Sequence, residues 1–325
     1  MKYRSFFSNR NNKAKRFHLV YSSVYLWIRV RFYIIFKHMK IQLISFFLCI
    51  SLCSLKAQHK IIVPQIGIVE NMENDSLLHA FGYTYLVEST QKILSPRNVS
   101  DQQFQIHLQK IKQLQVPLFA CNIFLPGDLK VVGPVVDEQA ILRYTEVVLQ
   151  RAQIAGLKMI IWGSGGSRGI PEGFDRAKAK EQFIYMAKKI AMVGEKYNII
   201  LALENLNRTE CNFINTLKEA LEIVSAVDHD HLRLCADIYH MLKEDEEPEI
   251  IASAKKYIVY CEVAEKEGRT PPGVHQENFK PYLSALQKIG YNGNISIECW
   301  WKNVREQGNL AYQNIHNQID EVYKN

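Results

Sequence analysis

Residues 60–325 alternate between short apolar runs and longer amphipathic stretches, and this alternation constrains the fold more than any other feature. The short runs are rich in β-branched and apolar residues, which is typical of buried strands. Eight strands are expected, at Ile61–Val69, Tyr83–Glu88, Pro117–Ile123, Lys158–Trp162, Ile199–Asn205, Leu232–Asp237, Tyr257–Ala264 and Asn294–Cys299. Helices are expected near 76–81, 100–114, 137–155, 175–196, 213–227, 246–254, 277–289 and 306–323.

Eight strand-helix repeats over roughly 265 residues match the usual size of a (β/α)8 TIM barrel. A doubly wound open sheet is the other α/β fold to consider. That fold needs a Gly-rich turn after the first strand, and the sequence has none there. No segment rich in Pro, Gly or Ser separates two halves, so residues 58–325 are expected to form a single barrel domain.

The positive charge of the chain is confined to its beginning. The sequence has 40 Lys and Arg against 33 Asp and Glu, a formal charge of +7. Eleven of the basic residues and none of the acidic ones lie in residues 1–57, which leaves 29 against 33, or −4, from Gln58 onward. A mildly acidic body gives no support to a nucleic-acid partner.

Residues 39–57 have the pattern of a secretory signal peptide. Met39-Lys40 precedes an apolar run at Ile41–Leu55, and Ala57 is a small residue before the polar Gln58. We expect a start at Met39 and cleavage after Ala57, with 1–38 as an upstream extension or a long positive segment. The protein is then exported, to the periplasm, without a stable membrane span. A retained N-terminal anchor is the alternative, although the run is short for a spanning helix.

Five of the seven cysteines follow this leader: Cys121, Cys211, Cys235, Cys261 and Cys299. An odd number without CxxC spacing argues against a disulfide framework and against a thiolate zinc site. Most lie in short apolar runs, where cysteine behaves as a small hydrophobic residue. We therefore expect them to pack in the core.

Acidic residues stand at the expected ends of the last four strands. Glu204, Asp237, Glu262 and Glu298 each follow an apolar run. In a TIM barrel the functional site is built at the carboxyl ends of the strands. A buried ionised carboxylate is costly unless it is paired or binds a metal, so the pattern favours a divalent cation with oxygen ligands. An acid cluster neutralised by Arg and Lys from the loops is the alternative.

Four strings in the second half of the chain carry a resemblance to a known family. They are Leu203-Glu-Asn-Leu-Asn-Arg-Thr-Glu210, Asp237-Ile-Tyr-His240, Ala264-Glu-Lys-Glu-Gly-Arg269 with Pro272-Gly273, and Gly290-Tyr-Asn-Gly-Asn-Ile-Ser-Ile-Glu298. In order and spacing they resemble the sugar phosphate isomerase/epimerase superfamily of xylose isomerase-like barrels. The most similar branch holds ketose 3-epimerases, hydroxypyruvate isomerases and inosose dehydratases. The resemblance runs from about residue 60 to the end.

The resemblance implies a metal centre and an acid/base pair. Glu204, Asp237 and Glu298 match positions that ligate a divalent metal, with manganese, cobalt or magnesium expected. Glu204 and Glu298 would also transfer protons on opposite sides of a bound sugar.

The resemblance further implies substrate-binding residues. Glu210 and His240 match positions that hold substrate hydroxyls. Arg269 lies near the substrate-binding arginine of the family, in a loop that is one residue longer here.

One position departs from the family pattern. The seventh strand usually supplies a histidine ligand, but here the run reads Tyr260-Cys261-Glu262 and Glu262 takes the ligand position. Four carboxylates around a divalent ion leave a surplus of about two negative charges, which Arg269, His240 or a raised pKa must offset. A fourth carboxylate favours a harder cation over zinc.

The expected chemistry is removal of a proton next to the carbonyl of a keto-sugar. Return of the proton gives epimerisation or isomerisation, whereas loss of a β-hydroxyl gives dehydration. Export favours an unphosphorylated sugar. A hydro-lyase or hydratase acting on a 3-keto sugar or keto-glycoside, and a non-catalytic sugar-binding barrel, are the alternatives. The resemblance is compatible with a homodimer.

Other residues at strand ends are weaker candidates. The loop Gly163–Gly169 could cradle an anion beside Arg168, or its glycines could serve only a tight turn. Trp162, Trp300 and Trp301 could stack on a sugar or pack in the core. Glu88 could reach the pocket or pair with Arg168.

Overall fold

The computed structural model describes residues 27, 29, 31–40, 42 and 62–324. The chain divides into two units, Met1–Lys60 and Ile61–Asn325, which are described separately. In the first unit, residues 31–40 form a helix with exposed side chains. The expected signal peptide lies outside the described residues except for Met39, Lys40 and Gln42. Within the described parts of the chain, no helix combines the length and the apolar character needed to cross a membrane.

Eight parallel strands close into a barrel in sequence order, and β8 completes the barrel by pairing with β1. The strands are β1 (Gln65–Val69), β2 (Tyr85–Ser89), β3 (Leu118–Asn122), β4 (Met159–Trp162), β5 (Ile200–Glu204), β6 (Leu232–Asp237), β7 (Ile258–Val263) and β8 (Asn294–Ile297). A closed sheet excludes the doubly wound alternative. The predicted (β/α)8 fold is confirmed.

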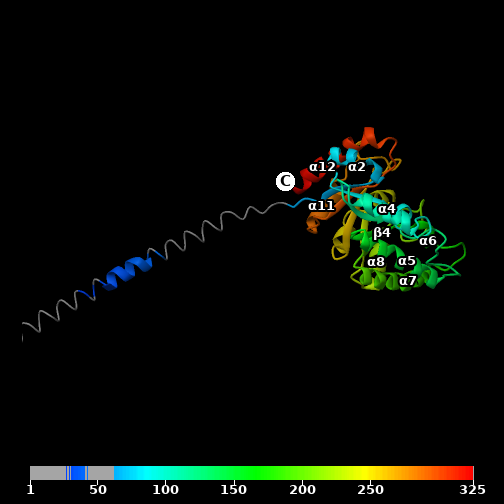
Figure 1. Ribbon diagram of the computed structural model, residues 1–325, viewed down its shortest axis with the longest axis horizontal. Coiled ribbons are helices and arrows are strands. Elements are labelled where there is room, and N and C mark those ends of the chain that lie inside the picture. Colours follow the sequence, from blue (N-terminus) through cyan, green and yellow to red (C-terminus); the bar gives the residue numbers. More distant parts are fainter. Residues whose placement is uncertain (1–26, 28, 30, 41, 43–61, 325) are drawn as a thin grey trace, which may run out of the picture. The chain divides into compact units, whose positions relative to one another are not determined.

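Helices follow the strands and cover the outside of the barrel. The helices expected from the sequence are α2 (Asp75–Phe81), α4 (Asp101–Ile111), α5 (Glu138–Ile154), α7 (Arg176–Tyr197), α8 (Leu217–Val227), α10 (Ile250–Ala254), α11 (Lys280–Lys288) and α12 (Val304–Tyr323). Helices α5, α7 and α8 lie side by side (Figure 1). Short additional helices not foreseen in the sequence are η1 (Met72–Asn74), α3 (Thr90–Ile93), α6 (Gly165–Arg168) and α9 (Ile238–Lys243).

The strands divide the core into two layers because successive side chains point to opposite faces of the sheet. A small inner cluster fills the barrel and includes Met159, Ile161 and Tyr260. A larger outer cluster lies between the barrel and its helices and includes Ile160 and Trp162. Strand β4 therefore alternates between the two layers, residue by residue.

The parallel arrangement brings the carboxyl ends of all strands to one end of the barrel. Glu204 is the last residue of β5 and Asp237 is the last residue of β6. Glu262 lies one residue before the end of β7 and pairs in register with Asp237, while Glu298 directly follows β8. The four predicted acids therefore occupy adjacent strands at the same level of the barrel.

Candidate active site

The four strand-end acids converge on one point. One carboxylate oxygen from each of Glu204, Asp237, Glu262 and Glu298 lies within 4.8 Å of the others. Glu204, Asp237 and Glu262 are buried, and Glu298 is partly exposed. The spacing of these acids along the sequence predicted this cluster, and the structure brings all four together.

Burial and mutual repulsion raise the pKa values of three carboxyl groups in the cluster, those of Glu204, Asp237 and Glu262. Burial, followed by the charge of Glu298, raises the pKa of Glu204 to about 8. Burial also raises the pKa of Asp237 to about 7, although His240 and Arg269 oppose the rise. The pKa of Glu262 is raised well above its ordinary value, again by burial first and by Glu298 second. Without a cation, these groups resist full ionisation.

The donor atoms of the cluster fit a divalent cation. Asp237 Oδ2 and Glu262 Oε1 are buried and have no hydrogen-bond partner among the described residues. Buried oxygen acceptors without partners are costly, and a hard cation would satisfy both at once. The residues at this point could therefore hold one metal ion through four carboxylates.

His240 lies against the same cluster, and its hydrogen bonds indicate a different role. Its Nε2 is 3.4 Å from both Glu204 Oε1 and Asp237 Oδ2. Its Nδ1 accepts a hydrogen bond of 3.0 Å from the backbone N–H of Asn207. In a neutral imidazole the other nitrogen, Nε2, then carries the proton and cannot ligate a metal. Burial lowers the pKa of His240, which favours this neutral form. The hydroxyl-binding role of His240 stays a prediction, because its side chain is fully buried and its Nε2 faces the two carboxylates.

Arg269 connects the cluster to the predicted substrate-binding residue Glu210. Its Nη2 donates to Glu298 Oε2, and its Nη1 lies 3.3 Å from both carboxylate oxygens of Glu210. Burial alone would lower the pKa of Arg269, but the surrounding carboxylates, Glu298 foremost, hold it above its ordinary value. The longer loop therefore still delivers this arginine to the site, where its charge offsets part of the acidic surplus.

Three supporting residues were not assigned a role from the sequence. Asn122, at the end of β3, donates a 2.7 Å hydrogen bond to Glu298 Oε1. The side chain of Asn205 accepts from the backbone N–H of Asp237 and donates to its carbonyl, both at 3.2 Å, which ties the ends of β5 and β6 together. Each amide directly ends or follows a strand, which is the only signal in the sequence that could have identified it.

Glu265 is the third of these residues, and it shapes the loop that carries Arg269. Its buried carboxylate accepts hydrogen bonds from the backbone N–H groups of Gly273 at 2.7 Å and His275 at 2.6 Å. It also accepts from the hydroxyl of Thr270 at 2.9 Å. A carboxylate that organises three donors from one loop is a positioning residue. Its place directly after β7 was visible in the sequence, but its direction was not.

Gly163, which follows β4, allows the close approach of Glu204. A Cβ atom at this position would lie 2.2 Å from Glu204 Oε2, so any side chain would displace the carboxylate. The site therefore favours glycine here because of the space that Glu204 takes, whereas the backbone φ of Gly163 lies outside the left-handed region.

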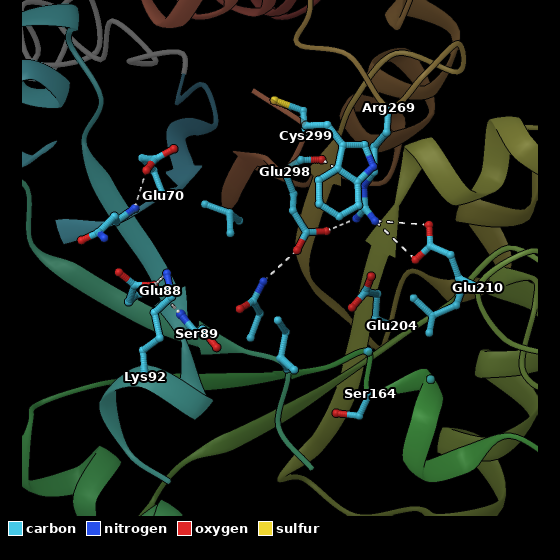
Figure 2. Close-up of a pocket in the computed structure, with 18 residues that line it drawn as sticks. Glu70, Glu88, Ser89, Lys92, Ser164, Glu204, Glu210, Arg269, Glu298 and Cys299 are labelled. Atoms are coloured by element: carbon cyan, nitrogen blue, oxygen red, sulfur yellow. Dashed lines mark hydrogen bonds and ion pairs between the residues drawn. The ribbon is translucent and has the colours of Figure 1, made fainter. Parts of the chain in front are cut away.

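A cavity of about 530 Å³ opens above the cluster. Figure 2 shows Glu70, Glu88, Ser89 and Lys92 on one side of this space and Glu204, Glu210, Arg269 and Glu298 on the other. The lining residues also include Val69, Asn71, Asn122, Ile123, Gly163, Ser164, Gly165, Leu206, Cys299 and Trp300. A pocket of this size is typical of small-molecule sites.

Three predicted substrate-binding residues, Trp162, Arg168 and His240, do not line this cavity. Trp162 is fully buried in the outer layer. The centroid of its ring lies 5.0 Å from the ring centroid of Phe183 in α7. Arg168 is also fully buried, and it donates to the carbonyls of Trp162 and Ile214. The predicted sugar contact of Trp162 and the anion-binding role of Arg168 were therefore wrong. The physical reason is the pleat of β4, which turns Trp162 outward, together with the single turn of α6, which directs Arg168 inward.

The other three candidates at strand ends differ in their positions. Trp300 lines the cavity and is exposed at its rim, whereas Trp301 packs against the outer core. Glu88 lines the cavity and pairs with Lys92 at 3.3 Å, not with Arg168. The five cysteines of residues 62–324 are free thiols, and all except the half-buried Cys299 are buried.

Comparison with known proteins identifies the family. Residues 76–320 match the family described as "Xylose isomerase-like TIM barrel". The match covers most of the chain, so this protein belongs to that family. The resemblance inferred from the sequence is confirmed.

Two curated relatives match parts of this chain. A D-psicose 3-epimerase from Ruminiclostridium cellulolyticum is 32% identical over 119 residues, which cover 36% of this chain and 40% of the relative. An inosose isomerase from Bacillus velezensis is 23% identical over 250 residues, covering 71% of this chain and 84% of the relative. For the first of these relatives the matched segment thus spans less than half of its length. The first relative is an epimerase of D-psicose and the second an isomerase of inosose.

Solved structures of similar proteins have the same fold. An L-ribulose 3-epimerase superposes with a TM-score of 0.69 at 18% identity, covering 81% of this chain and 96% of that one. The 3-keto-D-glucoside 4-epimerase of E. coli gives a TM-score of 0.66 at 16% identity, with coverages of 78% and 99%. The IolI protein with a bound zinc atom gives a TM-score of 0.62 at 19% identity, covering 80% of this chain and 98% of that one.

Proposed function

We propose that this protein is a metal-dependent sugar isomerase or epimerase that moves a proton next to the carbonyl of a keto-sugar. The observation that carries the proposal is the convergence of four carboxylates within 4.8 Å, two of which, Glu204 and Glu298, also line the cavity. A divalent cation bound there would polarise the carbonyl oxygen of a bound sugar and so acidify the neighbouring C–H. Manganese, cobalt and magnesium are the expected ions, because a fourth carboxylate suits hard cations.

Two residues of the chain then transfer protons, and their neighbours orient them and the sugar. Glu204 and Glu298 are the acid/base pair: one, as a carboxylate, removes the proton, and the other, as a carboxylic acid, gives a proton to the substrate. Asn122 and Arg269 each hold one oxygen of Glu298, which fixes the direction in which this carboxylate accepts a proton. Glu210 and the Nε2–H of His240 are expected to hold hydroxyl groups of the sugar.

The charges in the cavity favour an unphosphorylated substrate. Only two cationic side chains, Lys92 and Arg269, are among the described residues that line it. Lys92 pairs with Glu88, and Arg269 pairs with Glu210 and Glu298. A phosphate would therefore meet a cavity rich in carboxylates, in which neither cationic side chain is free to bind it.

A hydro-lyase or hydratase acting on a 3-keto sugar or keto-glycoside is the second candidate. The observation that favours it is Glu262, which adds a buried carboxyl where the family pattern has histidine. A non-catalytic sugar-binding barrel ranks third, because both members of the proposed acid/base pair are present.

One experiment separates these candidates. The metal-loaded protein is incubated in D2O with a panel of free ketoses and 3-keto-glycosides, and the products are followed by NMR and mass spectrometry. Deuterium uptake without loss of water supports an isomerase or epimerase, whereas a change of hydration supports the lyase. Binding without any exchange would support the non-catalytic barrel and overturn the proposal.

We also propose export to the periplasm with cleavage after Ala57. The support is the signal-peptide pattern of residues 39–57. N-terminal sequencing of the protein from a periplasmic fraction tests it: a chain that begins at Gln58 is expected, and an intact leader would contradict it. A homodimer stays a prediction for light scattering of the purified protein.

A further inference from the structure

The cavity is larger than a single sugar requires. A hexose displaces roughly the volume of six water molecules, or about 180 Å³ at about 30 Å³ each. The cavity measures about 530 Å³. A keto-hexose placed against the acid cluster would leave more than half of the space unfilled, and that space has walls of its own.

The wall opposite the acid cluster is polar and rigidly built. It comes from the ends of β1 and β2 and from α3, which contribute Glu70, Glu88, Ser89 and Lys92 (Figure 2). Asn71 also lines the cavity. Glu88 is buried, and its carboxylate accepts hydrogen bonds from the backbone N–H groups of Met72 at 3.2 Å and Ser89 at 2.9 Å. None of these residues takes part in the proposed proton transfer. A carboxylate held this firmly at a cavity wall is suited to accept hydrogen bonds from sugar hydroxyls.

Two apolar side chains mark the mouth of the cavity. Ile123 and Trp300 line it and remain 49% and 68% exposed. Ile123 has a φ of 51°, a left-handed conformation that β-branched residues rarely adopt. Gln91 holds this conformation through a 3.0 Å hydrogen bond to the Ile123 carbonyl, and Trp300 is held by a 2.8 Å backbone hydrogen bond to Arg269. Strain of this kind persists at ligand sites, where it positions a contact.

The orphaned oxygen of Asn122 lies between the two walls. Asn122 ends β3, is buried and lines the cavity. Its Nδ2 donates a hydrogen bond to Glu298, but its Oδ1 has no hydrogen-bond partner among the described residues. A buried acceptor without a partner at a cavity wall favours a ligand with a hydroxyl donor at that point.

From these observations we propose that the β1–β2 side of the cavity is a subsite for a second, uncharged sugar ring. The substrate is then a keto-glycoside of disaccharide size rather than a free keto-hexose. On this side, two carboxylates, Glu70 and Glu88, face one cationic side chain, Lys92, which is already paired with Glu88. These charges exclude an anionic group and suit a neutral polyol. At the mouth of the cavity, the exposed ring of Trp300 lies 5.8 Å from the guanidinium of Arg269 and offers apolar surface to the outer edge of the second ring, as aromatic side chains do in many binding sites. This inference rests on the proposed function, because it extends the substrate of the same site.

The test compares a 3-keto-glucose with the 3-keto disaccharide built from it, using the metal-loaded full-length protein. The readout is the ratio of kcat/KM for disaccharide to kcat/KM for free sugar, measured by deuterium exchange. The wild type is expected to prefer the disaccharide at least tenfold, about 1.4 kcal/mol. Trp300→Ala and Glu88→Gln should each lower this ratio about fivefold or more. Ile106→Ala, which removes a 62% exposed side chain from α4 far from the cavity lining, is the control and should leave the ratio unchanged.

Equal kcat/KM for the two sugars in the wild type, or a ratio untouched by both variants, would overturn the subsite. Calorimetry of disaccharide binding is a second measurement, and it does not depend on catalysis. If neither sugar exchanges deuterium, the proposed function fails, yet the subsite still predicts tighter binding of the disaccharide and its loss in Trp300→Ala. Equal binding of the two sugars would then overturn the subsite as well.

Discussion

The thiol of Cys235 donates a hydrogen bond to Glu262 Oε2 across 3.4 Å, inside the barrel where β6 and β7 lie side by side. This is the only hydrogen bond to the Glu262 side chain among the described residues, and the other oxygen has no partner. One weak thiol donor does not compensate a buried carboxylate. Glu262 is therefore either protonated or bound to a cation, and the metal decides between these states.

Replacing Glu262 with histidine restores the family's ligand and should change the choice of metal. We expect Glu262→His to bind zinc more tightly relative to manganese or magnesium, because imidazole is the softer ligand and removes one negative charge. Competitive metal binding followed by elemental analysis measures this. Glu262→Gln is the matched control and should weaken all divalent metals. Loss of folding in Glu262→His with unchanged metal selectivity would mean that the residue is structural.

The metal-free protein should lose stability as the pH rises. The folded-state pKa values of about 8 for Glu204 and about 7 for Asp237 lie above those of the unfolded chain. The folded state then binds more protons, so this stabilisation is complete below about pH 4 and is lost as the pH rises to about 8. A bound cation reverses the preference, because the carboxylates must ionise to bind it.

Thermal unfolding with and without manganese measures this linkage. The increase in Tm produced by the metal should be small near pH 5 and largest near pH 8. Calorimetry in buffers of different ionisation enthalpy should show about one proton or more released for each metal bound near pH 7. A metal effect that does not depend on pH would contradict the protonation states assigned to the cluster.

Gly163→Ala should damage the site more than the fold. The new methyl group would lie 2.2 Å from Glu204 Oε2, and the carboxylate can move aside because it ends a flexible side chain. We expect metal affinity or kcat/KM to fall about 10- to 100-fold, the usual cost of disturbing a ligand's surroundings. Gly127→Ala, where the nearest atom would be 3.8 Å away, is the control. A large fall in Tm with unchanged kinetics would show that Gly163 serves only the turn.

The sequence predicted the fold well because the barrel repeats one signal eight times. Each buried parallel strand is a short apolar run, and most of them end at or next to a polar residue, so β6 was bounded correctly at Leu232–Asp237. The acid cluster followed from the same rule, since parallel strands must end together. The short helices α3, α6 and α9 follow strands directly and have too few residues for a helical period to be visible.

Side-chain direction could not be predicted from the sequence in the same way. Trp162 and Glu204 both end apolar strands, yet the pleat turns the first toward α7 and the second toward the cavity. A shift of one residue in register would have exchanged these faces. Arg168 likewise points inward, to the backbone carbonyls of Trp162 and of Ile214, and the second of these is distant in the sequence. Such contacts depend on the closure of the barrel, which no local pattern encodes.

The most direct test of the central account is deuterium exchange at the carbon next to the carbonyl of the preferred keto-sugar. Wild-type protein, Glu204→Gln and Glu298→Gln are compared in D2O at matched metal occupancy. The proposed roles predict rapid exchange in the wild type and a fall of about 10²- to 10⁴-fold in each variant, the usual contribution of a general acid or base. Exchange at the wild-type rate in both variants would contradict the assignment of Glu204 and Glu298 as the proton-transfer pair.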